Sequence, residues 1–207
     1  MQLNLHILLA CCYNEAMMII LAILIVLVLW AVLIYNGLIT LRTRSGEAWA
    51  DIEVQLKRRY DLIPNLVNTI KGSTNFEQST LTRVVEARAK ATSIQIDPNK
   101  VDATTMQKLS ASQTELSSAL GRLLVVSEQY PDLKSNQNFL SLQNELSDTE
   151  NKIQAARRFY NGNVRDLNIK IESFPSNILA NMFNFSKKEF FDLGDDDAAQ
   201  NPVEVKF

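Results

Sequence analysis

Residues 17–34, with the sequence MMIILAILIVLVLWAVLI, decide the fold of this chain. The run contains no charged residue, and as a helix rising about 1.5 Å per residue it spans about 27 Å, close to the hydrocarbon thickness of a bilayer. A helix buried in a globular core is a poor match for so long an apolar run. Trp30 and Tyr35 stand near one end, where aromatic rings favour the membrane interface. The run therefore predicts a single transmembrane helix at residues 17–35.

A cleaved signal peptide is the competing interpretation of this run. Signal peptides carry a basic segment before the apolar segment and a small-residue cleavage site after it. Neither is present here, since no Lys or Arg precedes Arg42. The sequence favours a permanent anchor preceded by a short extension, residues 1–16. Because Met17 begins the apolar run, it stays open whether that extension belongs to the native protein.

The basic residues near the apolar run all follow it. Arg42 and Arg44 stand shortly after the run, whereas the segment before it carries Glu15 alone. Positively charged flanks stay on the cytoplasmic side of a membrane. We therefore expect a short N-terminus outside and the bulk of the chain in the cytoplasm.

A helical packing seam begins shortly after the anchor. Its positions follow steps of three and four, and Arg59 is the single charged member. We expect a short junction containing Ser45-Gly46 before this helix, although the sequence leaves open whether one helix runs unbroken from the membrane into the bundle. Pro64 should kink the helix or start a new one, because proline has no N–H to donate four residues back. The seam consists of Trp49, Ile52, Leu56, Arg59, Ile63, Leu66 and Ile70.

Two further helices are predicted before residue 130. The first covers about 76–93 and is followed by a turn at 96–99. The second covers about 102–129 and contains Gly121, where a neighbouring element could approach closely. Pro131 bends or breaks the chain after it. Their apolar sides consist of Leu81, Val84, Val85 and Ala91 in the first, and of Met106, Leu109, Leu116, Leu120, Leu123 and Leu124 in the second.

The longest periodic pattern lies between residues 139 and 171 and predicts a helix of more than thirty residues. Phe174-Pro175 ends it. Beyond that point, residues 178–191 can form a short apolar segment packed on the bundle, and residues 194–200 are acidic, which favours disorder. The long seam consists of Phe139, Leu142, Leu146, Thr149, Ile153, Ala156, Tyr160, Val164, Leu167 and Ile171.

Together these patterns predict an all-α protein, in which a single N-terminal transmembrane helix is followed by an elongated antiparallel bundle of about four long helices. Alternating strand patterns with frequent turn signals do not occur. The two cysteines are adjacent and precede the anchor, so no disulfide framework is expected. The expected divisions are residues 1–16 as the extension, 17–35 as the anchor, 36–193 as a cytoplasmic helical bundle and 194–207 as a flexible acidic tail.

Composition and residue types argue against catalysis. The net charge is −2, which disfavours a nucleic-acid partner. His6 is the one histidine and precedes the anchor, so the soluble part has no Ser–His or Cys–His pair and no Cys/His zinc site. Glu145 and Asp148 share a helix face and leave a carboxylate-pair or metal site formally open, but a solvated face is the better interpretation. We expect no enzymatic activity, no cofactor and no metal ion.

The basic run Lys57-Arg58-Arg59 could bind lipid headgroups or nucleic acid. If the first helix is continuous, however, Lys57 lies about 35 Å beyond Ile34, which is several Debye lengths from the bilayer. We therefore prefer a structural role, in which Arg59 pairs with a carboxylate inside the bundle.

Several strings stand in order along the chain: YNGL at 35–38, EAW at 47–49, QLKRRYDLIPNLV at 55–67, YPDLK at 130–134 and TEN at 149–151. AARRFYN at 155–161 and PVEVKF at 202–207 continue the series. Together they resemble the LemA family of bacterial membrane proteins over about residues 17–207. The resemblance implies a single anchor in the bacterial cytoplasmic (inner) membrane and a bundle of long helices. It implies no agreed enzymatic chemistry. Family members are often encoded near membrane proteases, which suggests an adaptor or quality-control role.

We therefore expect a membrane-anchored, non-enzymatic scaffold or adaptor that presents its bundle to a membrane-associated protein, such as a protease or quality-control complex. The alternative is a homo-oligomer that organises the membrane by packing its bundles side by side. The bilayer itself is a partner, and nucleic acid is not. The predicted partner-binding residues are polar members of the dense strings: Lys57, Arg58, Arg59, Asp61, Asn65, Asp132, Lys134 and Asn138.

Overall fold

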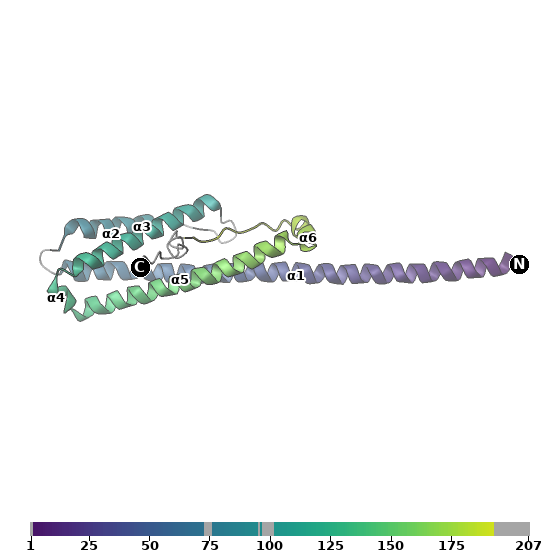
Figure 1. The fold of residues 1–207 in the computed structure, drawn as a ribbon, viewed down its shortest axis with the longest axis horizontal. Helices are drawn as coiled ribbons and strands as arrows, with labels where there is room; N and C mark the ends of the chain where they lie inside the picture. The colour runs from purple at the N-terminus through teal and green to yellow at the C-terminus, as the bar shows by residue number, and fades with distance from the viewer. Residues whose placement is uncertain (1, 73–75, 95, 97–101, 193–207) are drawn as a thin grey trace, which may run out of the picture.

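The computed structural model describes residues 2–72, 76–94, 96 and 102–192, with side chains from residue 17 onward. Its axis is one helix, α1 (Gln2–Lys71), which contains 70 residues and is therefore about 105 Å long. The C-terminal half of α1 lies within a helical bundle, and the N-terminal half extends alone beyond it (Figure 1). The division of the chain into an extension, an anchor, a bundle and a tail stays a prediction. Helix α1 crosses residues 16–17 and 35–36 without interruption, and residues 194–207 lie outside the described part.

The junction expected at Ser45-Gly46 is absent, and that prediction is wrong. The Ser45 hydroxyl donates a hydrogen bond to the Arg42 carbonyl oxygen at 2.8 Å, so its polar group is satisfied within the helix. Ser45, Ala48 and Trp49 are buried by the surrounding bundle. A glycine inside a helix costs only about 1 kcal/mol, which this packing offsets.

Pro64 does not start a new helix, because it lies inside α1, and the kink that the sequence offered as the other outcome stays a prediction. Proline leaves the carbonyl oxygen four residues earlier without its helical donor, and here that oxygen belongs to Tyr60. The Arg88 side chain supplies the missing donor from α2, with Nε 2.7 Å from the Tyr60 oxygen. A hydrogen bond from another helix thus replaces the backbone hydrogen bond that Pro64 removes from α1.

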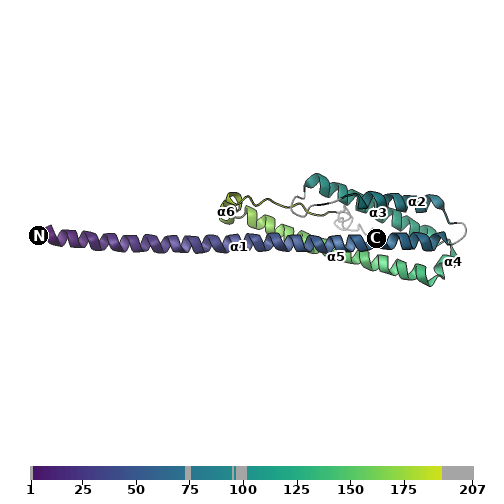
Figure 2. The ribbon, with the colours of Figure 1, turned by 180° about the vertical axis from the view of Figure 1, so that it is seen from behind.

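The remaining helices run antiparallel to one another along α1. We call the end of the bundle at Lys71, away from the apolar run, the distal end. From the distal end of α1, α2 (Gln78–Thr92) runs back, α3 (Ala103–Ser127) returns, and the short α4 (Pro131–Lys134) turns the chain into α5 (Gln137–Glu172). Helix α5 runs antiparallel to α1 along most of the bundle, and α6 (Ser176–Met182) lies where α1 leaves the bundle (Figures 1 and 2). The predicted all-α class, with an apolar N-terminal helix and an antiparallel bundle, is confirmed.

The core divides into three clusters along the axis. A distal cluster joins α1, α2, α3 and α5, a middle cluster surrounds Trp49, and a basal cluster joins α1, α5 and α6. All seven members of the α1 seam are buried, as the spacing predicts. Val85 was expected in the core but is 48% exposed, because α2 packs through the faces of Leu81, Val84 and Ala91.

Residues 183–192 begin with a turn at 183–184 and then run back along α5 without helix or strand; we call this segment the strap. The Asn161 side chain pairs with the backbone of Phe191 in both directions, at 2.9 and 3.0 Å. Asn168 pairs with the backbone of Lys188 in the same way. Phe191 is fully buried, with its ring 5.9 Å from that of Trp49. The strap thus closes the middle of the bundle.

The apolar run at residues 17–34 is not a core helix. Only 6% of its most apolar 18-residue window is buried, and within the described residues α1 is the helix long and apolar enough to cross a membrane. Exposed Leu, Ile and Val side chains cover the run on all sides. Such an exposed apolar surface is unfavourable in water, and it makes the run a candidate membrane-spanning segment.

Candidate functional site

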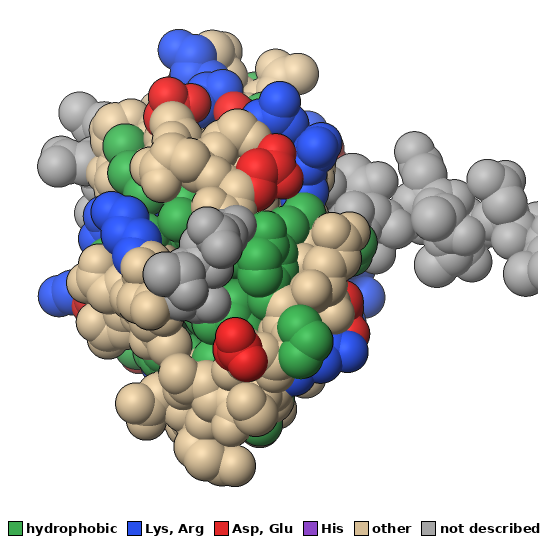
Figure 3. All heavy atoms as spheres, turned by 90° about the vertical axis from the view of Figure 1, so that its left-hand side faces the viewer, with side chains coloured by type: hydrophobic (Ala, Val, Ile, Leu, Met, Phe, Trp, Pro, Cys, Tyr) green, Lys and Arg blue, Asp and Glu red, His purple; other side chains and the backbone are tan. Residues whose placement is uncertain are grey.

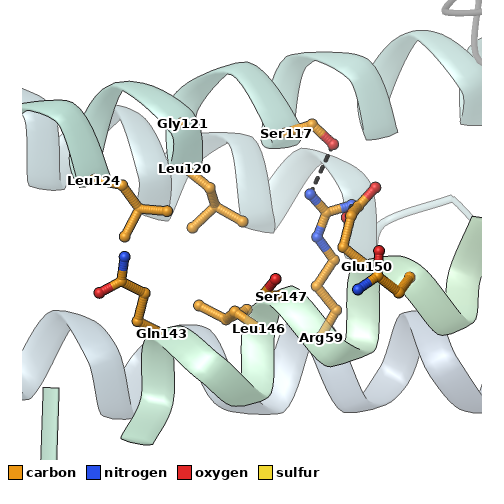
Figure 4. A pocket seen from close by; sticks show the side chains of 10 residues that line it. Arg59, Ser117, Leu120, Gly121, Leu124, Gln143, Leu146, Ser147 and Glu150 are labelled. Atoms are coloured by element: carbon orange, nitrogen blue, oxygen red, sulfur yellow. Dashed lines mark hydrogen bonds and ion pairs between the residues drawn. The ribbon is translucent and has the colours of Figure 1, made fainter. Parts of the chain in front are cut away.

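A cleft of about 390 Å³ opens between α3 and α5, with α1 behind it (Figure 4). Leu120 and Leu124 of α3 and Leu146 of α5 form its apolar walls. Arg59 reaches into it from α1. The polar lining consists of Arg59, Ser117, Gln143, Ser147, Glu150 and Asn151.

Arg59 is the charged centre of the cleft, and only 4% of its side chain is exposed. Its Nη2 donates to the Ser117 hydroxyl at 2.7 Å, and its Nη1 lies 3.2 Å from Glu150 Oε2. The N–H groups on Nη1 form an ion pair there but no well-aligned hydrogen bond. The prediction that Arg59 pairs with a carboxylate inside the bundle is confirmed, and that carboxylate is Glu150.

Burial lowers the pKa of Arg59, while the nearby Glu150 carboxylate opposes the shift. A guanidinium stays protonated in proteins even so, and the cleft therefore holds a permanent positive charge. The Glu150 side chain is 31% exposed and so neutralises this charge from the solvent side. An anionic or carbonyl group that enters the cleft would therefore share this desolvated cation with Glu150, and electrostatic attraction there is stronger than in water.

Gly121 lies on the α3 side of the cleft. The expectation of a close approach at this residue is wrong, because a Cβ built there would meet nothing within 4 Å. The open space in front of Gly121 is part of the cleft itself. The missing side chain widens the cleft and does not serve helix packing.

The cleft contains one of the eight predicted partner-binding residues, Arg59. Lys57, Arg58, Asp61 and Asn65 are exposed on α1 and do not line it. Whether these residues bind a partner stays a prediction.

The other three predicted residues, Asp132, Lys134 and Asn138, are exposed at the distal end, where Lys134 pairs with Glu128. Figure 3 looks at this end and shows apolar side chains gathered in its middle, with charged side chains around them. The Phe76 and Tyr130 rings, 5.0 Å apart, belong to this end of the core. The distal end is a surface separate from the cleft. Whether Asp132, Lys134 and Asn138 bind a partner there stays a prediction.

The sequence reasoning missed Ser117, Gln143, Ser147 and Asn151. They stand on the polar sides of two amphipathic helices, where periodicity does not separate a cleft wall from ordinary surface. One signal was available, because Glu150 and Asn151 belong to the TEN string that carries the family resemblance. That string lies directly at the cleft.

A metal or acid–base site finds no support in the described residues. No group of three or more His, Cys, Asp or Glu side chains that could hold a metal ion occurs there. Asp148 pairs with Lys152 at 2.8 Å on the exposed side of α5, and Glu145 is exposed as well. Lys152 lowers the pKa of Asp148, first through its hydrogen bond and also through its charge. These carboxylates form a solvated helix face.

The fold and the lipid-type surface of residues 17–34 define the class: a membrane-associated, all-helical protein with one apolar N-terminal helix and an elongated bundle. A family model described as LemA family matches residues 48–207, so the chain belongs to the LemA family.

Named relatives extend the comparison. The chain is similar to Protein LemA of Metamycoplasma hominis, with 32% identity over 129 residues, covering 62% of this chain and 55% of that protein. It is also similar to Magnetosome protein MamQ 2 of Paramagnetospirillum magneticum, with 25% identity over 76% of this chain and 64% of that protein. Magnetosome protein MamQ of Magnetospirillum gryphiswaldense matches at 24% identity, over the same shares. This chain thus spans less than two thirds of the length of these relatives.

Proposed function

We propose that this chain is a membrane-anchored, non-enzymatic adaptor of the LemA type that presents the cleft around Arg59 to a membrane-associated protein. The carrying observation is a buried guanidinium with incompletely used donors in an open, partly apolar cleft. A protease or quality-control complex is the class of partner that the family resemblance suggests. We further propose the cytoplasmic (inner) membrane of a bacterium, with the bundle in the cytoplasm.

The chemistry of the cleft supports a protein ligand. Leu120, Leu124 and Leu146 offer an apolar anchoring surface, while Gln143, Ser147 and Asn151 supply polar groups around it. Protein interfaces combine an apolar centre with a polar rim and are enriched in arginine. A partner segment with an apolar side chain next to a carboxylate or carbonyl group would satisfy both parts of the cleft.

The test compares two matched glycine variants of the full-length protein, extracted gently from its own membrane. Gly121→Phe fills the cleft, whereas Gly162→Phe adds the same side chain to α5 about 16 Å along the helix from Asn151. A Cβ at either position meets nothing within 4 Å, so the backbone surroundings of both glycines leave room for a side chain to start. We expect one partner protein, distinct from this chain, to co-purify with both the wild type and Gly162→Phe. The same partner should be absent from the Gly121→Phe preparation.

Two outcomes would contradict the proposal. Equal retention of the partner by both variants would exclude the cleft as the binding site. If the wild type carried no other protein and formed a defined homo-oligomer, the adaptor role would be wrong and the membrane-organising alternative would replace it.

A further inference from the structure

The base of the bundle overlaps the end of the apolar run. Ile34 and Leu38 are buried against Leu179 and Ala180 of α6, and the Tyr35 and Phe183 rings lie 4.8 Å apart. One step closer to the N-terminus, Trp30 and Ile34 line a hollow of about 350 Å³ together with Phe174. The residues around α6 therefore lie level with residues 30–38 of α1.

The segment at this level has no charged side chain. Residues 173–186 read SFPSNILANMFNFS, in a chain in which 21% of residues are charged. Helix α6 buries Leu179 and Ala180 and exposes apolar side chains on its other face as well. The exposed fractions are 80% for Phe174, 58% for Ile178, 62% for Met182 and 50% for Phe183. A helix at a water-facing surface would carry polar residues there.

Basic side chains follow on the side toward the bundle. Lys170 borders the hollow together with Asp166, and Lys187 and Lys188 follow the uncharged segment directly. Arg42 lies near Lys188, whose pKa is lowered first by burial and then by the Arg42 charge. Acidic groups are present too, since Lys187 pairs with Glu172 at 2.6 Å. In a membrane interface, such an apolar surface would meet the acyl chains, and the basic groups beside it would meet the headgroup phosphates.

We propose that Phe174 and α6 form a foot that inserts into the interface of the same bilayer that the apolar run spans. The depth agrees with this proposal, because Trp30 lies four residues, about 6 Å, inside the end of the run, and interfacial helices bury their apolar side by roughly 5–10 Å. The foot gives the bundle a second contact with the membrane and fixes its orientation against the bilayer. The inference is independent of the adaptor role.

The test measures depth by spin labels on the full-length chain in vesicles of phosphatidylethanolamine and phosphatidylglycerol. Cys11→Ser and Cys12→Ser remove both native thiols. Single cysteines then replace Phe174 or Met182, and Val125→Cys serves as the matched control. Val125 is also apolar and 67% exposed, but it lies in α3, outside the base. Collisions with oxygen, which concentrates in lipid, are compared with collisions with a water-soluble nickel chelate.

Labels at residues 174 and 182 are expected to collide several-fold more with oxygen, relative to nickel, than the label at residue 125. If nickel reached all three labels equally, the foot would lie in water and the proposal would be overturned. The vesicles contain no other protein. If Phe174 and α6 instead formed a binding surface for another protein, their labels would lie in water, and nickel would reach them as easily as the label at residue 125. Since all three positions are exposed, circular dichroism of the labelled variants should match that of the unlabelled protein.

Discussion

At the scale of single residues, Arg59 shows how a charge is kept inside a helical core. Its position in the α1 seam would suit a leucine, but Ser117 and Glu150 meet the guanidinium from two other helices. A buried pair of this kind contributes little net stability compared with apolar side chains of similar size, whereas removal of one partner leaves a costly charge. That asymmetry provides a test.

Glu150→Ala is expected to lower the free energy of unfolding by about 1–3 kcal/mol, because it leaves Arg59 buried without its counter-ion. The lower half of this range applies, since Glu150 is about a third exposed and partly screened by water. The double variant Arg59→Met/Glu150→Ala should recover most of the loss. Asp148→Ala removes an exposed carboxylate, paired with Lys152 on the surface of the same helix, and is the control. Equal losses for Glu150→Ala and Asp148→Ala in chemical denaturation would contradict the structural role of the pair.

Pro64 and Arg88 form a second coupled pair of residues. Arg88→Leu should cost about 1–3 kcal/mol, because the Tyr60 carbonyl oxygen then has no donor. In a Pro64→Ala background the loss should be clearly smaller, since the alanine N–H can donate to the same oxygen. A double-mutant cycle measured by denaturant unfolding isolates this coupling. Strictly additive effects would show that Arg88 does not replace the missing donor.

At the scale of elements, the strap contributes to the packing of the bundle although it is not a helix. Two asparagines of α5 bond its backbone, and Tyr160 donates to the Glu189 carbonyl oxygen at 3.0 Å. Burial, with a smaller contribution from Glu189, raises the pKa of Tyr160 to about 12, so its hydroxyl stays a donor at physiological pH. The strap places Phe191 in the middle cluster of the core, where its ring packs against that of Trp49.

Phe191→Ala should therefore cost about 3–5 kcal/mol, the usual loss for a large aromatic side chain in a core. Its neighbour Phe190 is 48% exposed, and Phe190→Ala should cost less than about 1 kcal/mol. Thermal unfolding of both variants in detergent gives the comparison. Similar melting temperatures for the two would mean that the strap does not hold the bundle together.

The glycine in α3 permits another test at this scale. Gly121→Ala should stabilise the protein by about 0.5–1 kcal/mol, since alanine is the better helix former and nothing lies within 4 Å of the added Cβ. Gly162→Ala in α5 should behave alike for the same reason. If Gly121→Ala, but not Gly162→Ala, lowered the free energy of unfolding in a denaturant titration, a neighbouring element would pack closely against residue 121, as the sequence suggested.

At the scale of the whole molecule, α1 is a single long helix that carries both the apolar run and the first helix of the bundle. From Ile34 to Lys71 it rises 37 residues, or about 55 Å. The distal end of the bundle should therefore stand about 55 Å above the bilayer, which atomic force microscopy of supported membranes can measure. Thr43→Pro interrupts the helical hydrogen bonds of α1 at an exposed position and should broaden the distribution of heights. An unchanged distribution would show that the foot alone orients the bundle.

The sequence by itself determined the class of the molecule. The length of the uncharged run at residues 17–34 predicts the anchor. The seams of α1 and α5, which repeat every three or four residues, predict the long helices. It also predicted that Arg59 is paired, because a cation at a seam position cannot stay buried alone.

Only the tertiary structure decided which groups meet. The donor for Tyr60 stands 28 residues away, and Ser117 stands 58 residues from Arg59, distances over which a helical period carries no information. The continuity of α1 through Pro64, the cleft beside Arg59 and the level of α6 against Trp30 all depend on such long-range meetings. A repeat along the chain determines which face of a helix is buried, but the packing of several faces around one axis determines which side chains on those faces come into contact.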